Sequence, residues 1–128
     1  MIKQLHLIIF SCSKNCRDKV IPDEKIIIKA NCKSLCYGKL DFGWSMYMYD
    51  DINMPEPYNL TDLNEITQEQ LAAMALNPTN ELDLAIKQDS LQPGGKYILA
   101  FRAIRPSRVY GEVRYTMFVN AGPVNGKV

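Results

Sequence analysis

The sequence of 128 residues has little of what catalysis requires. It contains one histidine, His6, and its only paired glycines, Gly94-Gly95, belong to a turn rather than to a loop that cradles phosphate. A lone histidine in a strand-like run is more typical of a surface residue than of a general base or a metal ligand. No Ser–His–Asp set can be assembled around it. We therefore expect a protein that is not an enzyme and that binds no cofactor.

The chain also lacks a strong excess of charge and a long apolar run. Its formal net charge is +1, and no basic stripe is present that would neutralise nucleic-acid phosphates. No segment approaches the roughly 20 apolar residues that span a bilayer, and no polybasic cluster points to anionic lipid. Leu5 to Phe10 is short, carries His6 and lacks a small-residue cleavage site, so it predicts a first strand rather than a signal peptide. We expect neither nucleic acid nor a membrane as a direct partner.

Most of what is present is alternation of apolar and polar residues, the pattern of a strand buried on one face. An apolar fraction of 47% over this length predicts one globular domain, residues 1–128. The strands expected from alternation are 4–10, 26–32, 42–49, 81–87, 96–103 and 112–119. Trp44, in the inward row of the third strand, is expected in the core. Six or seven such strands predict an all-β protein of two stacked antiparallel sheets.

One segment breaks the alternation and predicts a short helix. Thr67 with Gln70 three residues later forms a capping box, and Asn77-Pro78 ends the run. We expect this helix to cross from one sheet to the other.

Four cysteines form two matched pairs, Cys12 with Cys16 and Cys32 with Cys36. An even number in a small domain favours two disulfides and an oxidising compartment, whereas the spacing also allows a four-cysteine zinc site. Disulfides can pair locally within each matched pair, or cross-link Cys12 to Cys36 and Cys16 to Cys32. Bridged cysteines need Cα atoms within about 7 Å, and strands ending near both pairs would separate them, so we favour local pairing.

The irregular segment between the third strand and the helix holds three further candidate features. Asn59-Leu60-Thr61 is a glycosylation sequon. Asp50 and Asp51 with Asn53 are hard oxygen ligands that could contribute to a calcium site, although loop acids are usually only solvated. The third feature is a group of three tyrosines. Tyrosine is favoured at interfaces and also packs across strands, so we expect these residues either to form a contact patch or to pack against neighbouring strands. They are Tyr47, Tyr49 and Tyr58.

The segment from Leu91 to Tyr97 resembles the turn before the penultimate strand of fibronectin type III domains, the tyrosine corner. The resemblance implies that Leu91 plugs the end of the core, that Pro93 and Gly94 make the turn, and that Tyr97 hydrogen-bonds back to it. The fold class expected is therefore a fibronectin type III/immunoglobulin-like antiparallel β-sandwich of about seven strands with one short helix inserted.

The order of motifs along the chain resembles the receptor-for-egg-jelly region of the polycystin-1 family, whose modules are fibronectin type III-like. The motifs that carry the resemblance are Cys12-Ser13-Lys14-Asn15-Cys16, Val20-Ile21-Pro22, Ile26 to Cys32, Cys36, Phe42-Gly43-Trp44-Ser45, Leu91 to Tyr97 and Gly111 to Val119.

This resemblance implies a structural or interaction module in the extracellular region of a membrane-anchored receptor, at the plasma or ciliary membrane. Its expected role is that of a folded spacer, an adhesion element or a part that senses ligand or force. Its expected partners are neighbouring modules of the same chain, with a protein or glycan ligand as a further possibility. The alternative is an intracellular β domain stabilised by four cysteines and zinc, acting as a protein-interaction adaptor.

Overall fold

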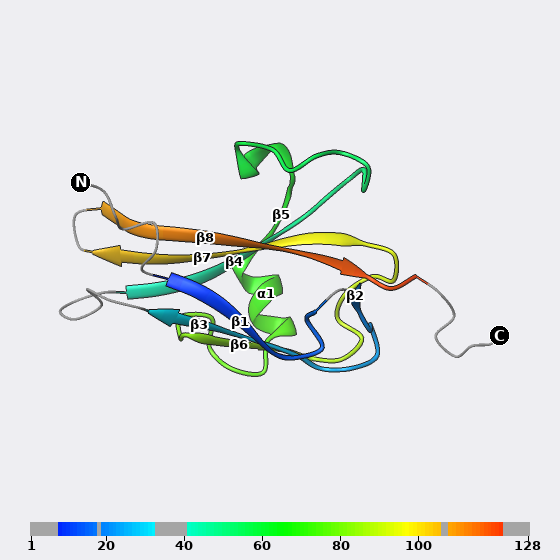
Figure 1. Ribbon diagram of the computed structural model, residues 1–128, viewed down its shortest axis with the longest axis horizontal. Coiled ribbons are helices and arrows are strands. Elements are labelled where there is room, and N and C mark those ends of the chain that lie inside the picture. The colour runs from blue at the N-terminus through cyan, green and yellow to red at the C-terminus, as the bar shows by residue number, and fades with distance from the viewer. Residues whose placement is uncertain (1–7, 18, 33–40, 106–107, 122–128) are drawn as a thin grey trace.

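The computed structural model describes residues 8–17, 19–32, 41–105 and 108–121. These residues form two β-sheets, packed face to face, with one α-helix and one 3-10 turn (Figure 1). In chain order the elements are β1 (Ile8–Lys14), β2 (Lys19–Val20), β3 (Ile26–Cys32), β4 (Asp41–Met48), η2 (Leu60–Asp62), β5 (Asn64–Ile66), α1 (Gln68–Met74), β6 (Asp83–Ile86), β7 (Lys96–Arg105) and β8 (Arg108–Val119).

The two sheets have the orders β1-β3-β6 and β2-β8-β7-β4-β5. Every pair of neighbours is antiparallel except β2 and β8, which are parallel. The predicted all-β sandwich is therefore confirmed. Strands β2 and β5 were not predicted, because two and three residues are too short for alternation to be visible.

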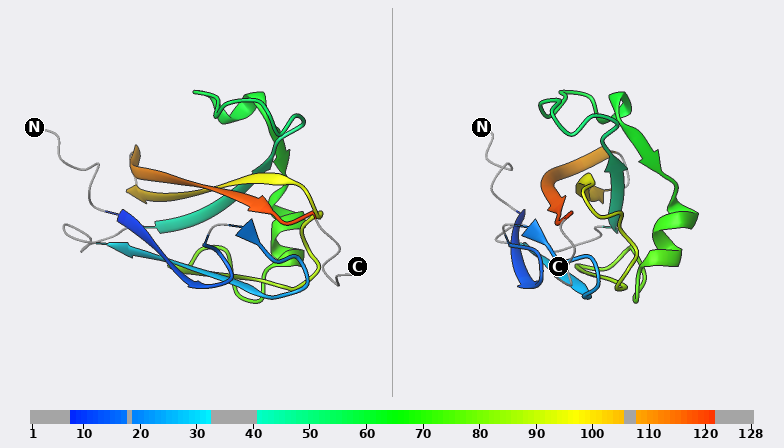
Figure 2. Two further views of the ribbon diagram at one scale, coloured as in Figure 1. Left: turned by 45° about the vertical axis from the view of Figure 1, so that its right-hand side comes forward. Right: turned by 90° about the vertical axis from the view of Figure 1, so that its right-hand side faces the viewer.

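Helix α1 lies where the sequence predicts it. Thr67 Oγ1 accepts from the Gln70 backbone N–H, and Gln70 Oε1 accepts from the Thr67 N–H, so both halves of the capping box are made. The helix follows β5 of the larger sheet and precedes β6 of the smaller one. The prediction that it crosses between the sheets is confirmed, and Figure 2 shows it closing one side of the sandwich.

The main core lies between the sheets and consists of the inward rows that alternation predicts. Trp44 on β4 is 1% exposed and lies at its centre. Its ring packs against Phe10 of β1 and Phe101 of β7, with centroids 5.5 and 4.8 Å apart. Its Nε1 donates to the Glu81 carbonyl at 2.8 Å. One side chain thus joins both sheets to the segment that leads into β6.

Two details of the predicted strands are wrong. The strand expected at 81–87 is shorter than predicted, because β6 begins only at Asp83; Leu82 lies outside the paired strand and is 38% exposed. The first strand, expected at 4–10, does not end at Phe10 but continues to Lys14, with a register shift between Cys12 and Lys14. The expected strand residues 4–7, including His6, lie outside the described part of the chain.

The tyrosine corner has the geometry that the resemblance implies. Tyr97, 2% exposed at the start of β7, accepts a hydrogen bond at Oη from the Gln92 backbone N–H, at 3.0 Å. Leu91 is buried beside it, and Gly94 adopts a φ of 79°, which only glycine takes without strain. A Cβ at Gly95 would lie 2.9 Å from Tyr97 Cε1, so this glycine also makes room for the ring.

Replacing Tyr97 with Phe should lower the free energy of unfolding by about 1 kcal/mol, because the Gln92 N–H then lacks its acceptor. Urea denaturation measures this as a lower midpoint with an unchanged slope. Tyr58→Phe is the matched control, since Tyr58 is 92% exposed and has no hydroxyl contact to lose within the described residues. Equal midpoints for the two variants would contradict a stabilising corner.

Candidate functional site

The outer face of the larger sheet is covered by the segment between β4 and β5. Tyr47 and Tyr49 point to this face and are only 6% and 3% exposed. The covering residues are Met54, Leu60 and Leu63. The segment covers this face because β5 returns alongside β4, with Met46 opposite Ile66, which folds the intervening chain back over the sheet. A contact patch that includes Tyr47 and Tyr49 is therefore wrong, and only Tyr58 is exposed.

Ile98 and Ala100 of β7 complete this second buried cluster, which the sequence reasoning missed. The sequence does contain a signal for this second cluster. Tyr97 to Phe101 is a continuous apolar run, and such a run is typical of a strand that is buried on both faces.

A buried lysine holds one part of the covering segment. Lys96 at the start of β7 is 9% exposed, and its Nζ donates to the carbonyls of Ile52 and Met54 at 3.4 and 3.2 Å. The ammonium also lies 4.2 Å from the centre of the Tyr49 ring and 5.0 Å from that of Phe118. Carbonyl oxygens and aromatic faces together offset part of the cost of burying this charge.

An arginine holds the other part. Arg114 on β8 donates from Nη1 to the Pro57 carbonyl at 3.1 Å and from Nη2 to the Tyr58 carbonyl at 3.0 Å. It also pairs with Glu56 at 3.3 Å and with Glu112 at 3.2 Å. We call these contacts the Arg114 clamp. The planar guanidinium suits this role, because it presents several donors in a fixed arrangement.

Glu112 links the clamp to a second arginine, since its Oε1 accepts from Arg102 Nε at 2.7 Å. Partial burial acts to raise the pKa of the Glu112 carboxyl, but hydrogen bonds from Arg102 and Arg114 and their positive charges outweigh burial and hold this pKa below its usual value. The same hydrogen bond raises the pKa of Arg102. Both groups thus stay ionised at neutral pH.

Tyr49 is the polar exception beneath the covering segment. Its hydroxyl is buried and has no hydrogen-bond partner among the described residues. Burial, followed by the negative charge of Glu56, raises the pKa of this phenol, while Arg114 acts to lower it. The phenol therefore stays neutral, and its contribution is its ring, which packs under Lys96.

The sequon lies on the outer surface of the covering segment. Leu60 and Leu63 are buried, whereas Asn59 and Thr61 are exposed. The Asp62 N–H donates to the Asn59 carbonyl at 3.1 Å, so the sequon forms a single tight turn. Tyr58, immediately before it, is 92% exposed. The Arg114 clamp and the two leucines therefore present Tyr58, Asn59 and Thr61 to solvent on an anchored turn.

The acids considered for calcium take part in hydrogen bonds within the protein. The Asp51 carboxylate accepts from the Asn53 N–H at 2.9 Å, and the Asp50 carboxylate accepts from the Asn64 side chain. In the part of the chain that the structure describes, no three His, Cys, Asp or Glu side chains gather as a metal would require.

Cys12 and Cys16 form a disulfide, with Cα atoms 5.5 Å apart. Cys16 is 2% exposed in the main core, and its carbonyl accepts from the Tyr115 hydroxyl on β8. Sulfurs joined in a disulfide cannot act as thiolate ligands, which counts against the four-cysteine zinc alternative. The side chain of Cys32 and all of Cys36 lie outside the described residues.

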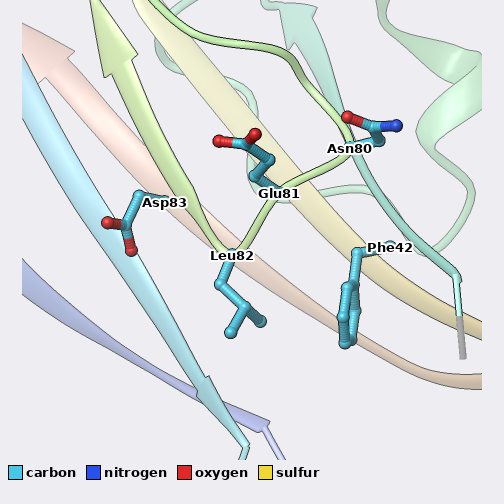
Figure 3. A pocket seen from close by; sticks show the side chains of 5 residues that line it. All are labelled: Phe42, Asn80, Glu81, Leu82 and Asp83. Atoms are coloured by element: carbon cyan, nitrogen blue, oxygen red, sulfur yellow. The ribbon is translucent and has the colours of Figure 1, made fainter.

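A shallow hollow of ≈ 440 Å³ opens beside the start of β4. Figure 3 shows Phe42 and Leu82 pointing the same way, with the Glu81 carboxylate turned away from them. Asn80 and Asp83 complete the lining. The hollow is an opening whose apolar lining is Phe42 and Leu82. The Glu81 carbonyl beside it already accepts a hydrogen bond from Trp44.

Although the net charge is small, acidic and basic residues are distributed unevenly along the chain. Residues 41–86 contain nine acidic residues and no Lys, Arg or His. All nine are exposed, and Glu56 is the one with an ion pair to a described residue. Glu65 and Asp83 lie on β5 and β6, which are sheet edges joined by α1. Charge on short edge strands disfavours pairing with further strands.

Comparison with known families gives one match. The model of the REJ domain family matches residues 3–128, essentially the whole chain. None of the curated proteins or solved structures compared with the chain matches it. Within the described residues, no helix has the length and hydropathy that a membrane crossing requires.

The Arg102–Glu112–Arg114 contacts should make the fold sensitive to acid. Because the pKa of Glu112 is lowered in the folded chain, its ionised form stabilises the fold above the ordinary value of about 4.3, and this contribution is lost as pH falls through the folded-state pKa. The unfolding free energies of the native chain and Glu112→Gln should differ by about 1 kcal/mol or less at neutral pH and converge once the pH has fallen below the folded-state pKa of Glu112.

Urea denaturation across this pH range measures the difference. Glu65→Gln is the control, because Glu65 has no ion pair to a described residue, and it should match the native chain throughout. A Glu112→Gln deficit that stays constant down to the lowest pH would contradict the assignment.

Proposed function

The chain belongs to the REJ domain family, whose members are modules of polycystin-1-like receptor ectodomains, and we propose that it is a non-enzymatic extracellular spacer. In this role it transmits tension between the neighbouring modules of its parent. The partners in this proposal are the modules before and after it, on the outer side of the plasma or ciliary membrane. Adhesion to a protein or glycan is a further role that such a spacer can support.

The position of the first and last strands supports a spacer. The described chain starts at one end of the long axis, where β1 begins, and leaves at the other end, where β8 finishes (Figure 1). Modules arranged in this way can follow one another in a line, and tension along the line passes through each sandwich from end to end.

The main support for resistance to tension is the parallel pairing of β2 with β8. Lys19 lies opposite Phe118 and Val20 opposite Val119, and the Asn120 N–H donates to the Val20 carbonyl at 2.8 Å. Pulling the chain from its two ends draws β2 and β8 in opposite directions along their length. Their hydrogen bonds, which run between the strands, are then loaded together rather than one after another.

Two contacts just before β2 reinforce this connection. The Cys12–Cys16 disulfide prevents the residues within its loop from extending under load. The Tyr115 hydroxyl binds the Cys16 carbonyl, so β8 also holds the chain ahead of β2. Both contacts involve Cys16, which lies between β1, where tension enters the sandwich, and β2.

Single-molecule force spectroscopy on Asn120→Pro tests the proposal. Proline has no N–H, so this variant loses the bond to Val20, whereas Asn120→Ala keeps it and is the matched control. Losing one bond of about 1 kcal/mol should make the unfolding rate at constant force about fivefold higher in Asn120→Pro than in Asn120→Ala, since both variants lack the Asn120 side chain and only the proline variant lacks the N–H. Tension must be applied through the two ends of the chain.

Equal unfolding rates for the two variants would contradict a load-bearing role for the β2–β8 pair. A native module that unfolds without measurable resistance would overturn the tension-transmitting function as a whole.

A further inference from the structure

The Asn59 side chain makes no hydrogen bond to another described residue. It precedes η2 but makes no side-chain capping bond, and its residue is exposed. Thr61, two residues on, is exposed on the same turn, while the backbone between them is held by buried Leu60. The two side chains of the sequon are therefore available without breaking any described contact.

We propose that Asn59 carries an N-linked oligosaccharide. The inference rests on the proposed extracellular function, since attachment requires passage through the secretory pathway. In chemical terms, C1 of the first sugar leaves the pyrophosphate of a lipid-linked oligosaccharide and bonds to Asn59 Nδ2. Nδ2 loses one proton, and the departing lipid pyrophosphate takes both the bonding electrons and, overall, that proton.

Asn77 shows the contrasting situation within the same chain. Asn77-Pro78-Thr79 has the spacing of a sequon, but proline in the middle position excludes it. The Asn77 amide is also engaged, donating to the Asp83 carbonyl at 2.8 Å and accepting from the Ala85 N–H at 3.0 Å. A glycan on Asn77 would break the link between α1 and β6, whereas one on Asn59 breaks nothing that is described.

The anchoring of the turn decides where the glycan lies. Arg114 binds the carbonyls of Pro57 and Tyr58, directly before Asn59, so the attachment point is fixed relative to β8. The Tyr58 ring, 92% exposed, offers an apolar surface to the first sugar. The oligosaccharide therefore shields the outer face of the larger sheet, the face already covered by the segment between β4 and β5.

The test uses the full chain, secreted from eukaryotic cells behind a cleavable leader. Intact mass is measured before and after peptide N-glycosidase, which removes the oligosaccharide and converts Asn59 to Asp. Thr61→Val keeps the shape of the side chain but lacks the hydroxyl, and should abolish the added mass. Thr61→Ser restores a hydroxyl and should retain it. Thiol counting on the same samples reports the disulfides.

The outcomes separate the two proposals. Secreted, oxidised protein with a glycan that Thr61→Val loses and Thr61→Ser keeps supports both. Secreted, oxidised protein with unmodified Asn59 overturns the glycan and leaves the proposed function standing. Retained protein with free thiols overturns the proposed function and the glycan with it. Should Thr61→Val fail to fold, peptide mapping of residues 56–63 in the native chain decides the question alone.

Nitration of Tyr58 measures separately whether the glycan shields this ring. Tyr58 in the glycosylated protein should be nitrated several-fold more slowly than after enzymatic removal of the glycan, while buried Tyr97 stays unreactive in both. Equal nitration of Tyr58 in the two samples would overturn the contact between the ring and the first sugar.

Discussion

Burial of both faces of β7 is the constraint on which the rest of the structure depends. Ile98, Leu99, Ala100 and Phe101 are consecutive, and each is fully buried. Leu99 and Phe101 lie in the core between the sheets, whereas Ile98 and Ala100 face outward and need a cover of their own. An ordinary sandwich leaves the outer face of a sheet to solvent. Here the chain between β4 and β5 supplies the missing layer.

That layer is short of apolar residues, so charged contacts hold it in place. Leu60 and Leu63 supply the buried contacts, and Lys96 and Arg114 bind four backbone carbonyls along the segment. Carbonyls are always available on the backbone, so two long cations can hold a segment of irregular shape. The exposed turn with Asn59 is a consequence, because its neighbours are fixed by burial on one side and by Arg114 on the other.

The proposed mechanical role and the distribution of charge follow from topology in a similar way. The parallel β2–β8 pair joins the second strand to the last one, and the acidic stretch 41–86 occupies the opposite side with β5, α1 and β6 (Figure 2). One side of the sandwich thus carries the connection proposed to bear load, and the other carries charged edges that resist further strand pairing. The two properties do not compete for the same surface.

The sequence by itself determined what depends on local periodicity and local turn chemistry. Alternation identified the inward row around Trp44, the capping box placed α1, and the Leu91 to Tyr97 turn located the tyrosine corner. These features follow from residues close together in the chain. Tertiary structure alone decided the burial of Tyr47 and Tyr49, because alternation reports one buried face and cannot say what covers the other. It also decided the contact of Arg114 with Glu56, 58 residues apart, and the pairing of β2 with β8. Such contacts depend on how the sheets bring distant segments together, and no local pattern records that.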